Sequence, residues 1–375
     1  MHISSISIIS PVRNAKIWFD AFARGIFNQQ ILALSGIEVE ISIFEDSSDS
    51  DEFEKFQDFI YTSLLLSQKY NIRIIFSGHM SPVPRGCGFG KNIAIQQSTG
   101  QLLVFADVDD VMLPERLAKL LQAMYSSNSN HTCCNTFGRS LSCRHEHCSY
   151  NTSRNLLFGS QFLRFPLDAT VRYSLWGNTV GKCWYRCYTE SLTSHGPCLI
   201  MPSWAICKQN FLVTGYFSER LGGFPEDLEW YLRHAFRNNG LFHFTEQPLV
   251  IYTYHQSATT FSVLEDTIID LRLHYLENYV FPLWDSFSIW GYKYARRVFN
   301  KLAPESKMKA RAFLDVNPRL IGLIYQNLVP IVHFEKAQVP ILICVKRDLT
   351  GGKFEENVNL ITSKLREGRD YLYFA

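Results

Sequence analysis

The chain has 375 residues, of which 46% are hydrophobic, and its formal net charge is only +2. This length allows two or three domains with a buried core, and so small a charge leaves any nucleic-acid contact to a local patch. Ten cysteines are too few for a disulfide scaffold, and no apolar run approaches the roughly 18 residues that span a bilayer. Because residues 1–10 also lack the features of a signal peptide, we expect a cytoplasmic protein without a membrane partner.

The first part of the chain alternates between predicted strands and amphipathic helices. The predicted strands are residues 3–10, 39–44, 72–76 and 102–105, and the predicted helices are 18–26 and 51–68. This alternation favours an α/β fold with a mostly parallel sheet. The second strand runs into Glu45 and Asp46, which either contact the base and ribose of a nucleotide or belong to a cap on the next helix.

A glycine-rich loop, residues 81–92, follows the third predicted strand. The P-loop pattern fails here because Arg85 stands at its first glycine and Asn92 at its hydroxyl position. The dinucleotide fingerprint fails as well, since it would follow the first strand. Two interpretations stay open. The loop either closes over a diphosphate, using Arg85, Lys91 and the amides of a helix that starts near Asn92, or is a plain connector.

The fourth predicted strand leads directly into Asp107-Val108-Asp109-Asp110. Ligands of α/β folds bind at the carboxyl ends of such strands. Three carboxylates this close repel one another unless a cation joins them, and hard oxygen ligands suit Mg²⁺ or Mn²⁺. We therefore predict that Asp107 and Asp109 clamp a metal ion and a diphosphate. The alternative is an Asp-rich turn that caps the helix after Leu113.

Residues 126–160 interrupt the pattern with a segment rich in Ser, Asn, Cys and His. Its potential zinc ligands are Cys133, Cys134, Cys143, His145, His147 and Cys148. Their spacing does not match a standard zinc finger, so we expect an inserted surface loop.

The second half of the chain contains two more candidate motifs. Glu226 and Asp227 stand at the start of an acidic helix, where the helix dipole favours carboxylates. His255 follows a predicted strand at 249–254, and a lone histidine in that place is usually structural. Further on, predicted strands at 312–316 and 341–345 indicate a small α/β appendage.

The order of the motifs resembles the nucleotide-sugar half of glycosyltransferase family 2. These motifs are a strand before Pro-x-x-Asn, a strand before Glu-Asp-x-Ser, a glycine-rich loop ending in Lys-Asn-x-Ala, and Asp-x-Asp-Asp. The resemblance implies a doubly wound GT-A domain, which we place at residues 1–260, followed by a C-terminal region at 261–375. It also implies a UDP-sugar donor and a divalent metal.

The resemblance further implies roles for single residues. Those on the nucleotide and diphosphate side are Pro11, Asn14, Glu45, Asp46, Arg85, Lys91, Asn92 and Asp107. Asp109 would hold the metal, and His255 would complete the metal shell or contact the diphosphate. Asp227, with Glu226 as second choice, would be the general base that takes the proton of the acceptor hydroxyl during inversion.

Motifs in the last third, around Trp284, Phe313 and Gly351, narrow the resemblance. They are similar to a subfamily that transfers galactose from UDP-galactose to queuosine, at the wobble position of tRNA for tyrosine. A basic stripe gives the RNA partner some support. It consists of Lys293, Arg296, Arg297, Lys301, Lys307, Lys309 and Arg311, although a solvated helix face is the commoner explanation for such a run.

Two alternative functions stay open. The first is a transferase that moves N-acetylglucosamine or another sugar from UDP to a glycan or protein. The lack of a membrane anchor argues against it. The second is a catalytically silent RNA-binding scaffold, and the presence of Asp107, Asp109, Asp227 and His255 argues against that function.

Overall fold

The computed structural model describes residues 3–33, 36–79, 83–130, 156–165, 191–192, 199–237, 240–345 and 350–374. These residues form two compact units, which divide between Leu264 and Glu265, with Ser191 and Leu192 in the second unit. None of the described helices combines the length and apolar character needed to cross a bilayer. Of the predicted insert at 126–160, the described parts belong to a helix and a strand, and the six Cys and His residues lie outside the described residues.

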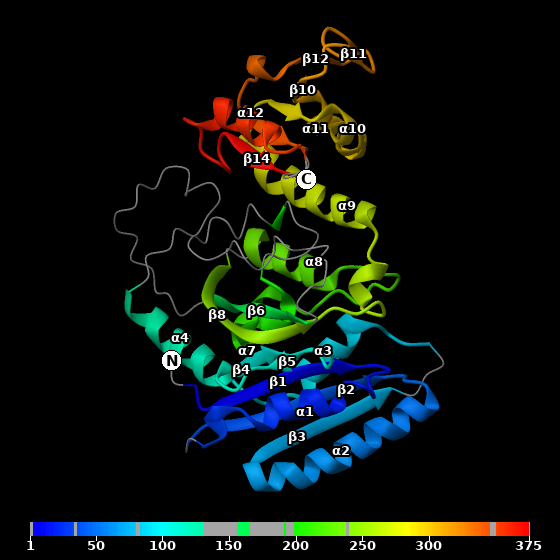
Figure 1. The fold of residues 1–375 in the computed structure, drawn as a ribbon, viewed down its shortest axis with the longest axis vertical. Coiled ribbons are helices and arrows are strands. Elements are labelled where there is room, and N and C mark those ends of the chain that lie inside the picture. Colours follow the sequence, from blue (N-terminus) through cyan, green and yellow to red (C-terminus); the bar gives the residue numbers. More distant parts are fainter. Residues whose placement is uncertain are drawn as a thin grey trace. The chain divides into compact units, whose positions relative to one another are not determined.

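An eight-stranded sheet organises the first unit, with strand order β3-β2-β1-β4-β7-β6-β8-β5 (Figure 1). The strands are β1 (Ser5–Val12), β2 (Glu38–Asp46), β3 (Ile72–His79), β4 (Leu102–Phe105), β5 (Val111–Met112), β6 (Leu156–Phe165), β7 (Ala205–Cys207) and β8 (Leu241–Thr253). The first four of these pair in parallel, while β7 is antiparallel to both β4 and β6. The predicted α/β class with a mostly parallel first half is thereby confirmed.

Helices cover this sheet and connect its strands. They are α1 (Phe19–Phe27), α2 (Ser50–Tyr70), α3 (Cys87–Gln97), α4 (Arg116–Asn130), α7 (Lys208–Thr214) and α8 (Glu226–Leu232), with short turns of helix at Gln30–Ala33, Met201–Ser203, Arg233–Arg237 and Thr259–Ser262. The prediction that α3 begins near Asn92 was wrong, because the helix already starts at Cys87. Gly86 allows this early start with a φ of 91°, and the carboxylate of Asp46 accepts hydrogen bonds from the amides of Arg85 and Gly86.

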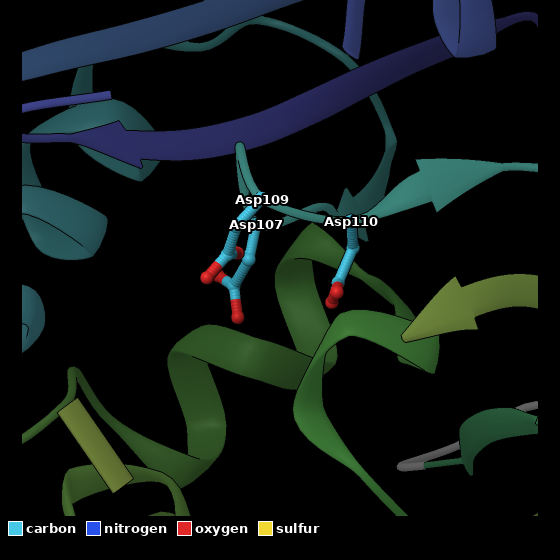
Figure 2. A group of neighbouring side chains, drawn as sticks. All are labelled: Asp107, Asp109 and Asp110. Atoms are coloured by element: carbon cyan, nitrogen blue, oxygen red, sulfur yellow. The ribbon is translucent and has the colours of Figure 1, made fainter. Parts of the chain in front are cut away.

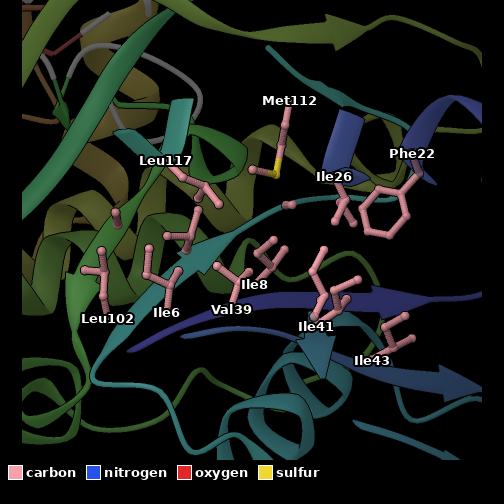
Figure 3. Close-up of a cluster of buried hydrophobic side chains, with 14 of the residues drawn as sticks. Ile6, Ile8, Phe22, Ile26, Val39, Ile41, Ile43, Leu102, Met112 and Leu117 are labelled. Atoms are coloured by element: carbon pink, nitrogen blue, oxygen red, sulfur yellow. The ribbon is translucent and has the colours of Figure 1, made fainter. Parts of the chain in front are cut away.

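The core of the first unit follows from alternation along the strands. Ile6 and Ile8 of β1, with Val39 and Ile41 of β2, point into a buried cluster that includes Phe22 of α1 (Figure 3). Residues of the opposite parity face α3, where the hydroxyl of Ser42 donates to the carbonyl of Ala94 at 2.6 Å. The sheet is therefore covered on both faces, and its carboxyl edge is left for polar side chains.

The second unit contains its own six-stranded sheet, ordered β11-β12-β10-β9-β13-β14. Its strands are β9 (Phe287–Trp290), β10 (Ala310–Asp315), β11 (Ile324–Tyr325), β12 (Val329–His333), β13 (Ile341–Ile343) and β14 (Tyr371–Tyr373), and its helices are α9 (Glu265–Tyr275), α10 (Tyr292–Lys301), α11 (Pro304–Met308) and α12 (Lys353–Thr362), with short turns of helix at Leu276–Val280, Phe281–Leu283 and Phe334–Lys336. All neighbouring strands pair in parallel except β11 and β12. The predicted strands at 312–316 and 341–345 correspond to β10 and β13, each displaced by one or two residues.

Candidate active site

Three carboxylates gather directly after β4. One oxygen from each of Asp107, Asp109 and Asp110 lies within 4.8 Å of the others. Figure 2 shows the side chains of Asp107 and Asp109 side by side, with Asp110 next to them and all three directed to the same side of the loop. We call these residues the carboxylate cluster. The amide of Asp110 donates to the carbonyl of Asp107 at 3.1 Å, which folds the loop into a tight turn.

Burial and mutual repulsion set the charge of the carboxylate cluster. Burial raises the pKa of Asp107 to about 7, with Lys91 opposing the shift and Asp109 adding to it. Burial and the charge of Asp109 also raise the pKa of Asp110 well above its usual range. The cluster therefore resists full ionisation by itself, and a bound cation would favour the ionised form.

The donor atoms of the carboxylate cluster fit a divalent metal ion. Asp110 Oδ1 accepts the amide of Thr253 at 2.8 Å, while its buried Oδ2 has no hydrogen-bond partner in the part of the chain that the structure describes. Carboxylate oxygens of this kind are the ligands that Mg²⁺ and Mn²⁺ prefer. Asp107, Asp109 and Asp110 would hold the ion, and Asp110 extends the predicted ligand set.

His255 lies at the edge of the cluster, next to a predicted metal ligand. Its Nε2 lies 2.8 Å from Asp109 Oδ2, and its Nδ1 lies 2.8 Å from the hydroxyl of Ser257. The ring also packs against Trp18, with 5.1 Å between the ring centroids. These contacts orient the imidazole toward Asp109, so the structure brings together two residues that are 146 positions apart in the sequence.

Arg116 is a fully buried cation behind the cluster that sequence reasoning missed. Its Nη2 donates to the carbonyl of Phe105 at 2.8 Å, while Nε and Nη1 have no hydrogen-bond partner among the described residues. Burial lowers its pKa to about 9, against the attraction of Asp110 and Asp107. The only signal in the sequence is a basic residue at the first position of an amphipathic helix.

Glu226 and Asp227 begin α8, as predicted, and we call them the acid pair. Glu226 Oε1 lies 2.7 Å from Lys91 Nζ in a buried ion pair. Asp227 Oδ1 accepts the amide of Leu228 at 2.7 Å. Burial and the charge of Glu226 raise the pKa of Asp227 to about 6, so this carboxyl is mainly ionised at neutral pH and remains able to accept a proton.

The residues predicted on the diphosphate side take several positions. Lys91 pairs with Glu226, and Asn92 bonds to the backbone of Phe217, so both side chains face the chain around the acid pair. Arg85 is partly exposed, and its guanidinium stacks 4.0 Å from the ring centroid of Phe89 and lies 3.9 Å from Glu219 Oε2. All three predicted side chains therefore have partners within the protein, and that of Arg85 is the most exposed.

The residues predicted around the nucleotide lie at the adjacent ends of β1 and β2. The side chain of Asn14 exchanges two hydrogen bonds with Asp49, at 3.1 and 3.0 Å, which joins the turns after the two strands. Glu45 is fully buried, and one of its oxygens accepts the amide of Ser48 at 2.5 Å, while the other has no hydrogen-bond partner within the described ranges. Pro11 stands opposite Phe44 in the strand register. The structure therefore groups these residues at the same sheet edge as the carboxylate cluster.

A mixed α/β sheet with a carboxylate cluster and an acid pair near the carboxyl ends of its parallel strands is typical of α/β proteins that bind a ligand at this edge. Residues 7–188, just under half of the chain, match the family model Glycosyl transferase family 2. This part of the first unit is therefore similar to glycosyltransferase family 2.

Solved structures of two glycosyltransferases are similar to the chain at low sequence identity. One is S. aureus TarS 1-349 in complex with UDP-GlcNAc, with a TM-score of 0.49, 15% identity, and coverage of 74% of this chain and 67% of that chain. The other is the mannosyltransferase PcManGT from Pyrobaculum calidifontis in complex with GDP-Man and Mn²⁺, with a TM-score of 0.42, 12% identity, and coverage of 74% and 62%. The chain spans only 40% of a longer S. aureus TarS structure. At this distance the solved structures say nothing about the substrates of this protein.

Proposed function

We propose that the protein is a metal-dependent inverting galactosyltransferase that moves galactose from UDP-galactose to queuosine at the wobble position of tRNA for tyrosine. The carboxylate cluster carries the first half of this proposal. Asp107, Asp109 and Asp110 offer oxygen ligands at the sheet edge of a glycosyltransferase family 2 domain. A divalent cation bound there would offset the negative charge of a diphosphate as it leaves.

The acid pair supports the second half of the proposal. In an inverting transfer the acceptor oxygen attacks the anomeric carbon, the bond from that carbon to the diphosphate oxygen breaks, and a base takes the hydroxyl proton. Asp227 suits the base, since among the described residues only backbone amides of its own helix bind it. Glu226 suits the role less well, because Lys91 already neutralises it.

The proposal of a tRNA partner is supported by the resemblance of the last third of the chain and by the part of the basic stripe that is not paired within the protein. Arg297 and Lys301 lie on one helix face, as predicted, but they pair with Glu265, Asp266 and Asp270 of α9. Lys309 donates to the carbonyls of Phe281 and Trp284. Of the stripe, Lys293 and Arg296 remain exposed on α10, and we assign the phosphate contacts to these two residues.

One incubation tests donor, acceptor and reaction together. The purified protein is mixed with Mn²⁺, tRNA that contains queuosine, and either UDP-galactose or UDP-N-acetylglucosamine, and the nucleosides are analysed by mass spectrometry. A hexose on queuosine with UDP-galactose alone is the expected result. UDP binding without a modified nucleoside would instead favour a glycan or protein acceptor, and absence of UDP binding would favour a silent scaffold. Transfer RNA without queuosine is the matched control.

A double charge reversal tests the RNA surface. Lys293→Glu with Arg296→Glu should weaken tRNA binding about tenfold or more, with a shallower salt dependence and unchanged UDP affinity. Arg297→Glu should instead lower stability, because its guanidinium pairs within the second unit. Unchanged tRNA affinity in the double variant would remove α10 from the RNA surface.

A further inference from the structure

One face of α3 is occupied by the chain that leads to the acid pair. Gly88, Lys91 and Asn92 are spaced i, i+3 and i+4, so they share a side of the helix. All three contact residues between Phe217 and Glu226, more than 120 positions away in the sequence. We call these three residues the clamp face and residues 217–227 the acid segment.

Lys91 fixes the end of the acid segment. Its side chain is 2% exposed and its Nζ lies 2.7 Å from Glu226 Oε1. Removing one partner of a buried ion pair leaves an uncompensated charge, so the pair fixes the position of Glu226 strongly. Asp227 is the next residue along the backbone, and its placement follows from that of Glu226.

Asn92 and Gly88 fix the start of the acid segment. Asn92 Nδ2 donates to the carbonyl of Phe217 at 3.0 Å, and Asn92 Oδ1 accepts the amide of Phe217 at 2.9 Å. The same amide group donates to Glu219 Oε1 at 2.9 Å. A Cβ atom on Gly88 would stand 2.0 Å from the carbonyl oxygen of Ser218, so the two backbones are in direct contact.

The middle of the acid segment has no regular secondary structure to fix its path. Gly222 and Gly223 both have positive φ values, 77° and 73°, and neither lies in a helix or strand. Glycines of this kind allow many backbone conformations. Holding the segment at both ends therefore determines where Asp227 stands.

We propose that Lys91 and Asn92 are positioning residues that hold the acid segment on α3 and thereby place Asp227 for proton transfer. This assignment rests on the proposed function and replaces the role implied by sequence, in which both residues touch the diphosphate. The two roles differ in what a substitution changes. A diphosphate contact affects donor binding, whereas a positioning residue affects turnover at constant donor binding.

The test compares Lys91→Met and Asn92→Ala with matched controls whose side chains form hydrogen bonds at the far end of α3. Lys208→Met removes a lysine that donates to the carbonyls of Ile95 and Ser98 at the far end of α3. Gln97→Ala removes an amide that donates to the carbonyl of Ile43 and accepts from Ser77. The two clamp variants should lower kcat about 100-fold, with UDP affinity within about threefold of wild type. The two controls should keep kcat.

A double variant sharpens the result. Glu226→Gln removes the charge that Lys91→Met leaves unpaired, so the double variant should regain about tenfold in kcat over Lys91→Met alone. Lys91→Arg keeps the charge and should retain more activity than Lys91→Met. A loss of UDP affinity of tenfold or more at unchanged kcat would overturn the proposal and return Lys91 to the diphosphate.

Hydrogen exchange makes the proposal testable apart from the reaction. Peptides that cover the acid segment should exchange about tenfold faster in Lys91→Met and Asn92→Ala than in wild type or in the two controls. If wild type transfers no sugar to any acceptor, the proposed function fails. The exchange rates then still test whether the clamp face holds the acid segment in place. Unchanged exchange in the acid segment would overturn the positioning role.

Discussion

Two groups of buried carboxylates lie toward opposite ends of the same parallel strands, and their surroundings differ. Glu40, near the start of β2, accepts hydrogen bonds from the hydroxyl of Ser7 at 2.6 Å, the amide of Thr99 at 2.5 Å, and the guanidinium of Arg73. Burial alone would raise its pKa, but these donors lower it to about 2. The Glu40 carboxylate is therefore ionised and well hydrogen-bonded, and it stabilises the fold.

The carboxylate cluster and the acid pair, at the carboxyl ends, show the reverse. Burial raises the pKa of Asp107 to about 7 and of Asp227 to about 6, and Asp110 keeps an oxygen without a partner. These groups make the unliganded fold less stable than it would be without their charges. The number of hydrogen-bond donors and the direction of the pKa shift therefore distinguish a carboxylate that stabilises the fold from carboxylates suited to bind a cation or a proton.

The largest expected effect comes from the carboxylate cluster. Asp109→Ala should lower transfer by about 10³-fold or more, because it removes a metal ligand and the carboxylate that His255 contacts. Steady-state kinetics with Mn²⁺ titration measures this effect. Asp58→Ala, which changes an exposed carboxylate paired with Lys55, is the control and should behave as wild type. Full activity of Asp109→Ala would place the metal elsewhere.

A slightly smaller effect is expected at the acid pair. Asp227→Asn keeps the shape of the side chain but cannot take a proton, so kcat should fall about 10²–10⁴-fold. Isothermal titration with UDP and Mn²⁺ should give an affinity close to that of wild type. A marked loss of UDP affinity would mean that Asp227 binds the donor and is not the base.

Glu40 should respond in stability and not in activity. Its pKa is lowered from 4.5 to about 2. The stabilisation is therefore fully present above about pH 4.5 and is lost as the pH falls through about 2. Glu40→Gln should lower the free energy of unfolding by about 3 kcal/mol at pH 7 and by much less near pH 2. Urea unfolding measures both values, and Glu38→Gln, an exposed change in the same strand, is the control.

The smallest expected effect is a pH dependence of stability whose sign is opposite to that caused by Glu40. The raised pKa values of Asp107 and Asp227 mean that the folded protein holds protons more tightly than the unfolded chain between about pH 4 and 7. Without metal, the free energy of unfolding should therefore fall as the pH rises through this window. Unfolding at pH 5 and 7.5 in EDTA measures it. Added Mn²⁺ should reduce the fall, and Asp107→Asn should flatten it. An unchanged slope in Asp107→Asn would show that this carboxyl is not its source.

Long-range contacts explain which parts of the structure the sequence could predict. The strand at 102–105 and the helix start at Glu226 were predicted at their true positions, because an apolar run and an acidic first turn are local signals. The start of α3 was missed because the carboxylate that holds Gly86 belongs to Asp46, forty residues earlier. The pairing of Lys91 with Glu226 spans 135 residues and has no local signal at all.

The second unit shows a different limit. It was predicted as a small appendage, yet it contains a six-stranded sheet with four helices. Its strands β13 and β14 have three residues each and β9 has four, too short for an alternation pattern to develop. Every residue of β9 and β13 is buried, so their sequences do not alternate between apolar and polar residues. Without that alternation, hydrophobic periodicity does not distinguish a strand from a helix.

Under the proposed function, the glycines at the start of α3 restrict how the donor side of the site can be redesigned. A methyl group at Gly88 would meet the backbone of Ser218, and one at Gly90 would stand 3.0 Å from the ring of Pro11 on another side of the helix. A mutant library aimed at a new sugar donor should therefore keep both positions as glycine. Diversity is better placed at Val83 and Arg85, whose exposed side chains leave room for replacement.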